Sequence, residues 1–200
     1  MACLQPPVRG LGLETGTSTQ ADLVGMAQWA RSHGHPELAA RCSDLLACSP
    51  CGATQLLDGP TGEANLYAVL PRQAVLCLAD NDGQRLLQLA AVLAVGSQAL
   101  WPASAQALAQ RLPTELQERI TLARDWQSDA ADFDAVFHHG PSGSLREVGI
   151  ALAKRPGRII PMESAPPEHF GVALERLVVE RSISLNTAAA GGNASLMTLG

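Results

Sequence analysis

The stretch that decides the fold is Ala74–Trp101, "AVLCLADNDGQRLLQLAAVLAVGSQALW". Its apolar opening, residues 74–79, predicts a buried strand. Asp80-Asn81-Asp82 then supplies capping residues for a helix in which leucine and alanine recur at helical spacing, and Gly96 is a natural C-terminal stop. "SQALW" follows as a second strand. A strand, a helix and another strand at this spacing predict a parallel βαβ unit.

The same alternation continues toward the C-terminus. We expect strands in "RITLA", "FDAVFHHG" and "GRIIPM", and helices in "SAQALAQRL", "GSLREVGIALAKR" and "VALERLVVE". "SISLN" is a last strand that leads into the terminal segment. The pattern predicts an α/β fold with a Rossmann-like, doubly wound and mostly parallel sheet.

The segments before Ala74 predict two additions to this sheet. A helix from Ser18 or Thr19 to about Ser32, and a second helix that opens at Pro36, form a helical lead-in or linker over residues 1–51. The rest, residues 52–200, is expected to be the Rossmann-like domain. It starts with a strand, a turn at residues 59–62 and a second strand, which form a β-hairpin or flap together with the C-terminal strand.

Composition narrows the function classes. The chain of 200 residues is 46% hydrophobic and 16% charged, and it carries a formal net charge of −5. This charge argues against a nucleic-acid partner. No apolar run reaches membrane-spanning length, and Met1-Ala2-Cys3 begins no signal peptide. We therefore expect a cytoplasmic domain with no membrane or nucleic-acid partner of its own.

The cysteines do not predict a metal site. Cys48-Ser-Pro-Cys51 has the C-x-x-C spacing, but no second such pair and no H-x₃-H sequence completes a zinc ligand set. Buried or loop thiols are the preferred interpretation, and a metal or redox role is the alternative.

The turns at the expected sheet edge carry unusual residues. After the first strand, a dinucleotide-binding sheet has phosphate-binding glycines. Asp80 and Asp82 here place carboxylates that repel a pyrophosphate, so cofactor binding at this turn is disfavoured. His138-His139 follows another strand, where adjacent residues point to opposite faces. Acid–base chemistry by this pair, or by Glu163, is the alternative to a purely structural role.

The C-terminal stretch "ERSISLNTAAAGGNASLMTLG", residues 180–200, contains no ionisable side chain after Arg181. Ser182–Asn186 alternates polar and apolar residues and predicts a strand with one buried face. The small residues 188–192 allow another backbone to approach closely. We interpret this stretch as a docking motif for a surface outside the chain. Asn193-Ala194-Ser195 matches a glycosylation sequon by chance.

This stretch resembles the C-terminal motif of the proline utilization A family, and "GPTGEANLYAVLPRQAVLCLA", residues 59–79, resembles the same family. The resemblance covers Leu56 to Gly200. It implies a parent protein in which an FAD-dependent barrel oxidises proline. The product passes through a tunnel to an NAD-dependent L-glutamate γ-semialdehyde dehydrogenase module. Long members add a C-terminal domain of the aldehyde dehydrogenase superfamily without activity of its own.

The resemblance implies that this chain is that added domain, without a cofactor of its own. Its implied partner is the dehydrogenase module of the same polypeptide, on which it packs and whose tunnel it covers. The parent is expected to be cytoplasmic, with peripheral membrane association left open. The docking motif comprises Ser184, Asn186, Thr187, Gly191, Gly192, Asn193, Ser195, Leu196 and Met197.

The cofactor positions of that superfamily are altered here, which implies lost NAD binding and no catalytic residue. Asp80 and Asn81 stand in the place of a Trp-Asn-Phe-Pro loop. Trp101 and Ser104 stand in the place of the Lys-Pro-x-Glu that holds the adenosine ribose, and His138 and His139 stand in the place of the Phe-Thr-Gly-Ser turn that lies over the cofactor phosphates. Two alternatives stay open. One is a cryptic NAD(P)-binding domain. The other is an oligomerisation module that self-associates through the strands near Asn65–Leu70 and Ser184–Asn186.

Overall fold

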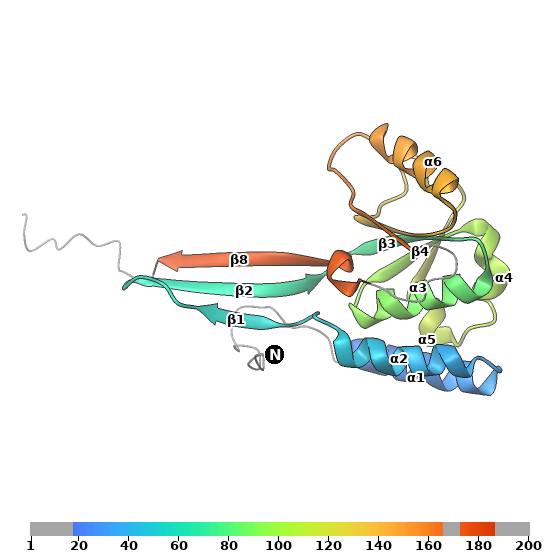
Figure 1. Cartoon of the computed structure of the whole chain (residues 1–200), viewed down its shortest axis with the longest axis horizontal. Helices are drawn as coiled ribbons and strands as arrows, with labels where there is room; N and C mark the ends of the chain where they lie inside the picture. Colours follow the sequence, from blue (N-terminus) through green and yellow to red (C-terminus); the bar gives the residue numbers. More distant parts are fainter. Residues whose placement is uncertain (1–17, 166–172, 187–200) are drawn as a thin grey trace, which may run out of the picture.

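The computed structural model describes residues 18–165 and 173–186, and it contains a five-stranded and a three-stranded sheet (Figure 1). The five-stranded sheet is parallel and has the order β5-β4-β3-β6-β7. Strands β4 and β5 follow β3 on one side of the sheet, and the chain then crosses to the other side of β3, where it forms β6 and β7. The order of the strands therefore reverses between β3 and β6. This confirms the predicted doubly wound α/β fold. The strands are β3 (Ala74–Ala79), β4 (Gln98–Pro102), β5 (Ile120–Ala123), β6 (Ala135–His139) and β7 (Met162–Ala165).

Helices cover both faces of this sheet, with α6 on one side and α3, α1 and α2 on the other (Figure 1). Alternate strand residues feed two cores, because successive side chains of a strand point to opposite faces. Cys77, Trp101 and Phe137 join the larger core, whereas Leu76 and Val136 join the smaller core under α6. The helices are α1 (Ser18–Ser32), α2 (Pro36–Cys48), α3 (Asp82–Ala94), α4 (Gln106–Ala109), α5 (Thr114–Gln117) and α6 (Ser142–Ala153), with short 3₁₀ turns η1 (Ala103–Ala105) and η2 (Leu174–Leu177).

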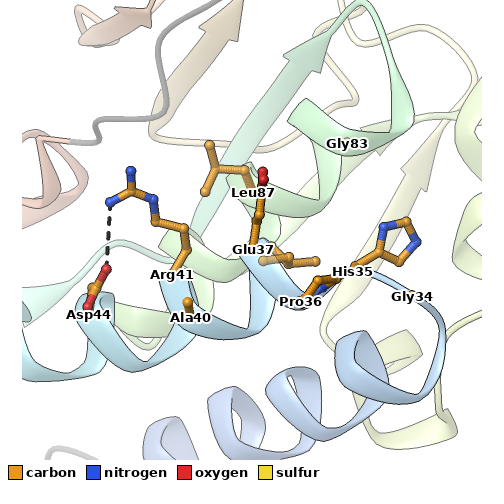
Figure 2. Close-up of a pocket in the computed structure, with 10 residues that line it drawn as sticks. Gly34, His35, Pro36, Glu37, Ala40, Arg41, Asp44, Gly83 and Leu87 are labelled. Atoms are coloured by element: carbon orange, nitrogen blue, oxygen red, sulfur yellow. Dashed lines mark ion pairs between the residues drawn. The ribbon is translucent and has the colours of Figure 1, made fainter.

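The N-terminal hairpin of α1 and α2 packs into the larger core. Asp22 forms an ion pair with Arg119 at 3.2 Å, and the Trp29 indole nitrogen donates to the Arg111 carbonyl at 3.1 Å. The division of the chain at residue 51 stays a prediction. Between α2 and α3 lies an open hollow of about 570 Å³ that is lined by Leu87 and by α2 side chains such as Arg41 (Figure 2).

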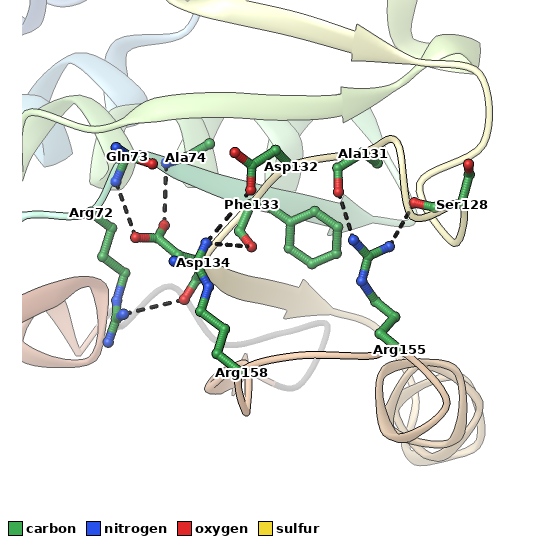
Figure 3. A network of polar contacts seen from close by, with 10 residues as sticks. All are labelled: Arg72, Gln73, Ala74, Ser128, Ala131, Asp132, Phe133, Asp134, Arg155 and Arg158. Carbon is green, nitrogen blue, oxygen red and sulfur yellow. Dashed lines mark hydrogen bonds and ion pairs between the residues drawn. The ribbon is translucent and has the colours of Figure 1, made fainter.

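The amino ends of β3 and β6 are joined by a polar clamp (Figure 3). The Asp134 carboxylate accepts hydrogen bonds from the Gln73 and Ala74 amides at 3.2 Å each, and Arg72 donates to the Asp134 carbonyl. Arg155 donates to the carbonyls of Ser128 and Ala131, which fixes the loop before β6. The clamp places polar anchoring at the amino edge and leaves the carboxyl edge for the residues considered as a site.

The three-stranded antiparallel sheet, here called the flap, consists of β1 (Thr54–Leu57), β2 (Glu63–Pro71) and β8 (Val178–Asn186), in the order β1-β2-β8. It projects away from the rest of the described chain (Figure 1). This confirms the expected flap that includes the C-terminal strand. β2 is the central strand, so Asn65–Leu70 has no free edge for pairing, contrary to the expectation for an oligomerisation module.

Two element assignments from the sequence are wrong. "GRIIPM" is mainly a loop, in which Gly157 has a φ of 97° and Ile159 is 96% exposed, and β7 begins only at Met162. "VALERLVVE" is a single 3₁₀ turn followed by β8 rather than a helix. The β-branched pair Val178-Val179 favours a strand, and pairing with Pro71 and Leu70 of β2 realises that preference.

Candidate functional site

The carboxyl edge of the parallel sheet brings together residues from three strand ends. His138 and His139 lie beside Leu78 and Ala79 in the β3–β6 register, and Asp80 and Asn81 follow directly. Trp101 lies near the end of β4, which is the other neighbour of β3. Ligands of doubly wound folds bind at this edge, next to the point where the strand order reverses. The predicted positions therefore share one edge of the molecule.

The residues of the turn after β3 form the N-terminal cap of α3. The Asn81 side-chain oxygen accepts the Gln84 amide hydrogen bond at 2.9 Å, which makes Asn81 the N-cap of α3. The Asp80 amide in turn donates to the Gln84 side-chain oxygen at 3.3 Å. Asp82 lies in the first turn of the helix, where an acidic side chain is favoured by the helix dipole. This confirms the capping role predicted for the turn.

Gln88 closes the gap between β3 and β6. Its side-chain nitrogen donates to the carbonyls of Leu78 and Phe137, both at 2.9 Å, and the residue is completely buried. A side chain of α3 thus bridges the two strands between which a doubly wound fold opens its ligand crevice. Sequence analysis missed Gln88, although one glutamine inside the apolar run "LLQLAAVLA" is the signal that marks it.

Trp101 is a core residue. Its side chain is fully buried in the larger core, whereas Ser104 is exposed in η1. Cys77 lies in the same core. Burial raises the pKa of its thiol to about 12, and the opposing effect of Arg85 is smaller. A thiol with this pKa is not a nucleophile at neutral pH.

The two histidines point away from each other, as expected for neighbours in a strand. The His138 ring nitrogen Nε2 lies 2.9 Å from the Ser144 hydroxyl, and that hydroxyl donates to the Pro141 carbonyl at 2.9 Å. With its proton directed at the Pro141 carbonyl, the Ser144 hydroxyl can accept a hydrogen bond from a protonated Nε2 of His138. Burial lowers the pKa of His138, against a smaller opposing effect of the Asp80 carboxylate.

His139 faces the other side and is 1% exposed, with its ring 4.8 Å from the Phe137 ring. Glu163 pairs with Phe137 in the β6–β7 register, and burial raises its pKa against a smaller opposing effect of Arg176. Acid–base chemistry by His138 and His139, or by Glu163, stays an alternative to a structural role.

Cys48 and Cys51 do not belong to a metal-ligand cluster within the described residues. Cys48 is exposed and Cys51 is half-buried, and burial raises the pKa of the Cys51 thiol. In the part of the chain that the structure describes, no three His, Cys, Asp or Glu side chains gather as a metal site. Nor does any helix of that part have the length and apolarity to cross a bilayer.

The flap has one apolar face. The antiparallel register places Leu56, Leu66 and Ile183 side by side, and Ala64 beside Leu185 on the same face. Leu56 is 63% exposed and Leu185 is 43% exposed. Within this chain the face of Ser182–Asn186 that is predicted to be buried is covered only in part, because Ile183 is half-buried and Leu185 reaches solvent toward the tip.

The opposite face of the flap carries the 39% exposed Leu57 beside a polar contact near its tip, where the Ser184 hydroxyl donates to the Asn65 side-chain oxygen. At its base that face contributes Val69 and Val178 to the larger core. Of the predicted docking motif, Ser184 and Asn186 lie in β8. The remaining members lie outside the described residues: Thr187, Gly191, Gly192, Asn193, Ser195, Leu196 and Met197.

Comparison with known proteins finds relatives along nearly the whole chain. The chain is 48% identical over 180 residues to the bifunctional protein PutA of Escherichia coli, which covers 89% of this chain and 14% of that protein. It is 32% identical over 189 residues to the bifunctional protein PutA of Rhizobium meliloti, with 91% and 15% covered. The chain thus spans about one seventh of the length of these relatives. No family model matches it.

Solved structures share the fold. A Bradyrhizobium japonicum proline utilization A superposes with a TM-score of 0.59 at 18% identity over 76% of this chain and 20% of that one. A betaine aldehyde dehydrogenase of Staphylococcus aureus gives a TM-score of 0.54 at 11% identity over 76% and 37%. At these identities the likeness concerns the fold, which is that of aldehyde dehydrogenases.

Proposed function

Because homologues of this chain are segments of bifunctional PutA proteins, we propose that it is a non-catalytic domain of a proline catabolic enzyme of that kind. In this proposal it packs on the dehydrogenase module of the same polypeptide and covers the tunnel between the two active sites. The parent uses FAD and NAD, and this domain binds neither.

The apolar face of the flap is the observation that carries the proposal. Leu56 and Leu185 lie exposed on one face of a sheet that projects from the domain (Figure 1). Exposed apolar surface of this kind marks an interaction site. About six sevenths of a PutA-length polypeptide lies outside the matched segment, since the segment covers 14% of the relatives. A large intramolecular partner is therefore available to cover this face.

Residues at the carboxyl edge of the parallel sheet support the proposal that this domain binds no nicotinamide cofactor. Gln88 ties β3 to β6 where a dinucleotide crevice opens, and Asp80 and Asp82 bring negative charge to the phosphate turn. Trp101 is buried instead of presenting a donor to a ribose. These residues do not fit a nicotinamide dinucleotide.

Calorimetric titration of the 200-residue chain with NAD and with NADP tests this part of the proposal. We expect no saturable heat up to a ligand concentration of about 1 mM, which corresponds to a binding free energy weaker than about −4 kcal/mol. An NAD-binding aldehyde dehydrogenase is the positive control. Saturable binding at micromolar concentrations favours the cryptic dehydrogenase instead.

The packing role is tested in the full-length PutA-like protein with two variants. Leu56→Asp/Leu185→Asp places charge on the apolar face, and deletion of residues 187–200 removes most of the docking motif. Burying an unpaired charge costs several kcal/mol, and about 1.4 kcal/mol is tenfold. We expect conversion of proline to glutamate to fall by about tenfold or more in each variant, while proline oxidation alone changes by less than about twofold.

Gln55→Asp is the matched control, since Gln55 is exposed on the opposite face of β1. We expect it to leave both activities unchanged. Coupled conversion at the unmodified rate in both variants contradicts the packing role. An equal loss of both activities, with a lowered melting temperature, indicates a general loss of structure.

A further inference from the structure

The turn between β6 and α6 places a hydroxyl against an imidazole. The Ser144 hydroxyl oxygen lies 2.9 Å from Nε2 of His138. This distance is within the range of about 2.6–3.2 Å at which a base can activate a nucleophile. Gly140 packs against both side chains, since a Cβ there would lie 3.0 Å from Oγ of Ser144 and 3.1 Å from Nε2 of His138. A larger residue at position 140 would therefore move the two groups apart.

His138 has the protonation state that a base requires. The residue is 3% exposed, and burial lowers the pKa of its imidazole, so the ring is neutral at pH 7. Nδ1 has no hydrogen-bond partner among the described residues, and it can carry the ring proton while Nε2 accepts. The Asp80 carboxylate opposes the lowering of this pKa, and it therefore stabilises the imidazolium that forms when Nε2 takes up a proton.

Ser144 is accessible to solvent, whereas its base lies beneath it. The residue is partly exposed, and Pro141, Ser142 and Gly143 beside it are exposed. In the resting geometry the Ser144 hydroxyl donates to the Pro141 carbonyl at 2.9 Å. A hydroxyl proton rotates to suit its partners, so the same oxygen can direct its proton to Nε2 without movement of the heavy atoms. A reagent in solution can therefore reach Oγ of Ser144.

The start of α6 provides donors for the negative charge that develops on a carbonyl under attack. The amides of Gly143 and Ser144 belong to the first turn of this helix, where N–H groups have no acceptor within the helix. The dipole of the helix also favours negative charge at this end. Backbone N–H groups of this kind stabilise the oxyanion in acyl transfer.

We propose that Ser144 is an acyl-acceptor site in which His138 is the base, with activated esters as the class of substrate. Oγ attacks the ester carbonyl, and its proton passes to Nε2. When the bond to the leaving group breaks, Nε2 gives this proton to the departing alcohol, and an acyl-serine remains. The open position of Ser144 provides few contacts to an ester, so the reactivity of the ester decides which one reacts. The site lies on the parallel sheet, whereas the proposed function uses the flap, so the two do not depend on each other.

A fluorophosphonate probe tests the proposal on the 200-residue chain, with its phosphorus in the place of the ester carbonyl carbon. Attack by Oγ releases fluoride, and peptide mass spectrometry locates the phosphonyl group. Ser142 is the matched internal control, since it is exposed in the same turn of α6. We expect the probe to label Ser144 at a rate about a hundredfold or more above that of Ser142, which is the usual contribution of a positioned base.

Four variants separate activation by His138 from exposure alone. Ser144→Ala should abolish the label, and Ser142→Ala should leave it unchanged. Gly140→Ala keeps both members of the pair but moves them apart, and His138→Gln removes the basic nitrogen. We expect each of these two substitutions to lower the labelling rate by about tenfold or more. Circular dichroism shows whether each variant is folded.

Equal labelling of Ser142 and Ser144 in the unmodified chain overturns the proposal, and so does a chain in which neither serine is labelled. This comparison needs no substitution, so it holds whether or not the buried His138→Gln variant folds. Labelling of Ser144 at the unmodified rate in a folded His138→Gln variant overturns the role of His138 as the base.

Discussion

Replacing Trp101 by alanine is expected to lower the free energy of unfolding by about 3–5 kcal/mol, the usual cost of removing a large aromatic side chain from a core. The Trp101 side chain is fully buried in the core that the sheet shares with α1, α2 and α3. A core relaxes only partly around a lost side chain, so the alanine variant leaves a cavity. Urea unfolding followed by circular dichroism measures the change.

Two further variants separate packing from chemistry at this position. Trp101→Lys restores the residue type that the family resemblance leads one to expect in a ribose-binding site. Because the site is buried, we expect it to cost more than the alanine variant, since a lysine ammonium loses its hydration there. Ser104→Ala, at an exposed position, should change stability by less than about 0.5 kcal/mol. A loss below about 1 kcal/mol for Trp101→Ala would contradict the core assignment.

The parallel sheet could be predicted because its signals are local. The run of residues 74–79 is apolar throughout, as expected of a strand covered on both faces. Asn81 caps the next helix within three residues of its partner, so the cap is visible in the sequence itself. Gly96 adopts a φ of 76°, which glycine allows at low cost. Each of these features depends on neighbours in the chain.

Features that depend on distant partners could not be predicted. Gln88 and the Phe137 carbonyl are 49 residues apart, and no local pattern indicates that they meet. The sequence "VALERLVVE" predicts a helix, whereas the start of β8 pairs with β2 across more than 100 residues, and this pairing decides its structure. The exposure of Leu185 follows from what covers the flap, and the proposed cover lies outside this chain.

Gln88→Leu is expected to destabilise the chain by about 2 kcal/mol, the net result of two opposing changes. Leucine has a similar volume, so the packing of α3 changes little. The carbonyls of Leu78 and Phe137 each lose a buried donor at 2.9 Å, which costs about 1–3 kcal/mol per group. The Gln88 side-chain oxygen has no hydrogen-bond partner among the described residues, and removing it returns part of that cost.

Gln88→Glu distinguishes bridging from packing at the same position. At pH 7 it places a carboxylate, which cannot donate, against two carbonyl oxygens in a site without solvent exposure. We therefore expect it to be more destabilising than Gln88→Leu. Burial raises the pKa of a carboxyl group, so the glutamate is protonated on mild acidification and regains one donor. Urea unfolding at pH 7 and at about pH 5 should show the glutamate variant recovering stability relative to the leucine variant.

If Gln88 only filled space, leucine would equal or exceed glutamine in stability, because an apolar side chain of that size fills a dry core better. The order glutamine, leucine, glutamate at pH 7 would instead establish that Gln88 holds β3 and β6 together by its hydrogen bonds.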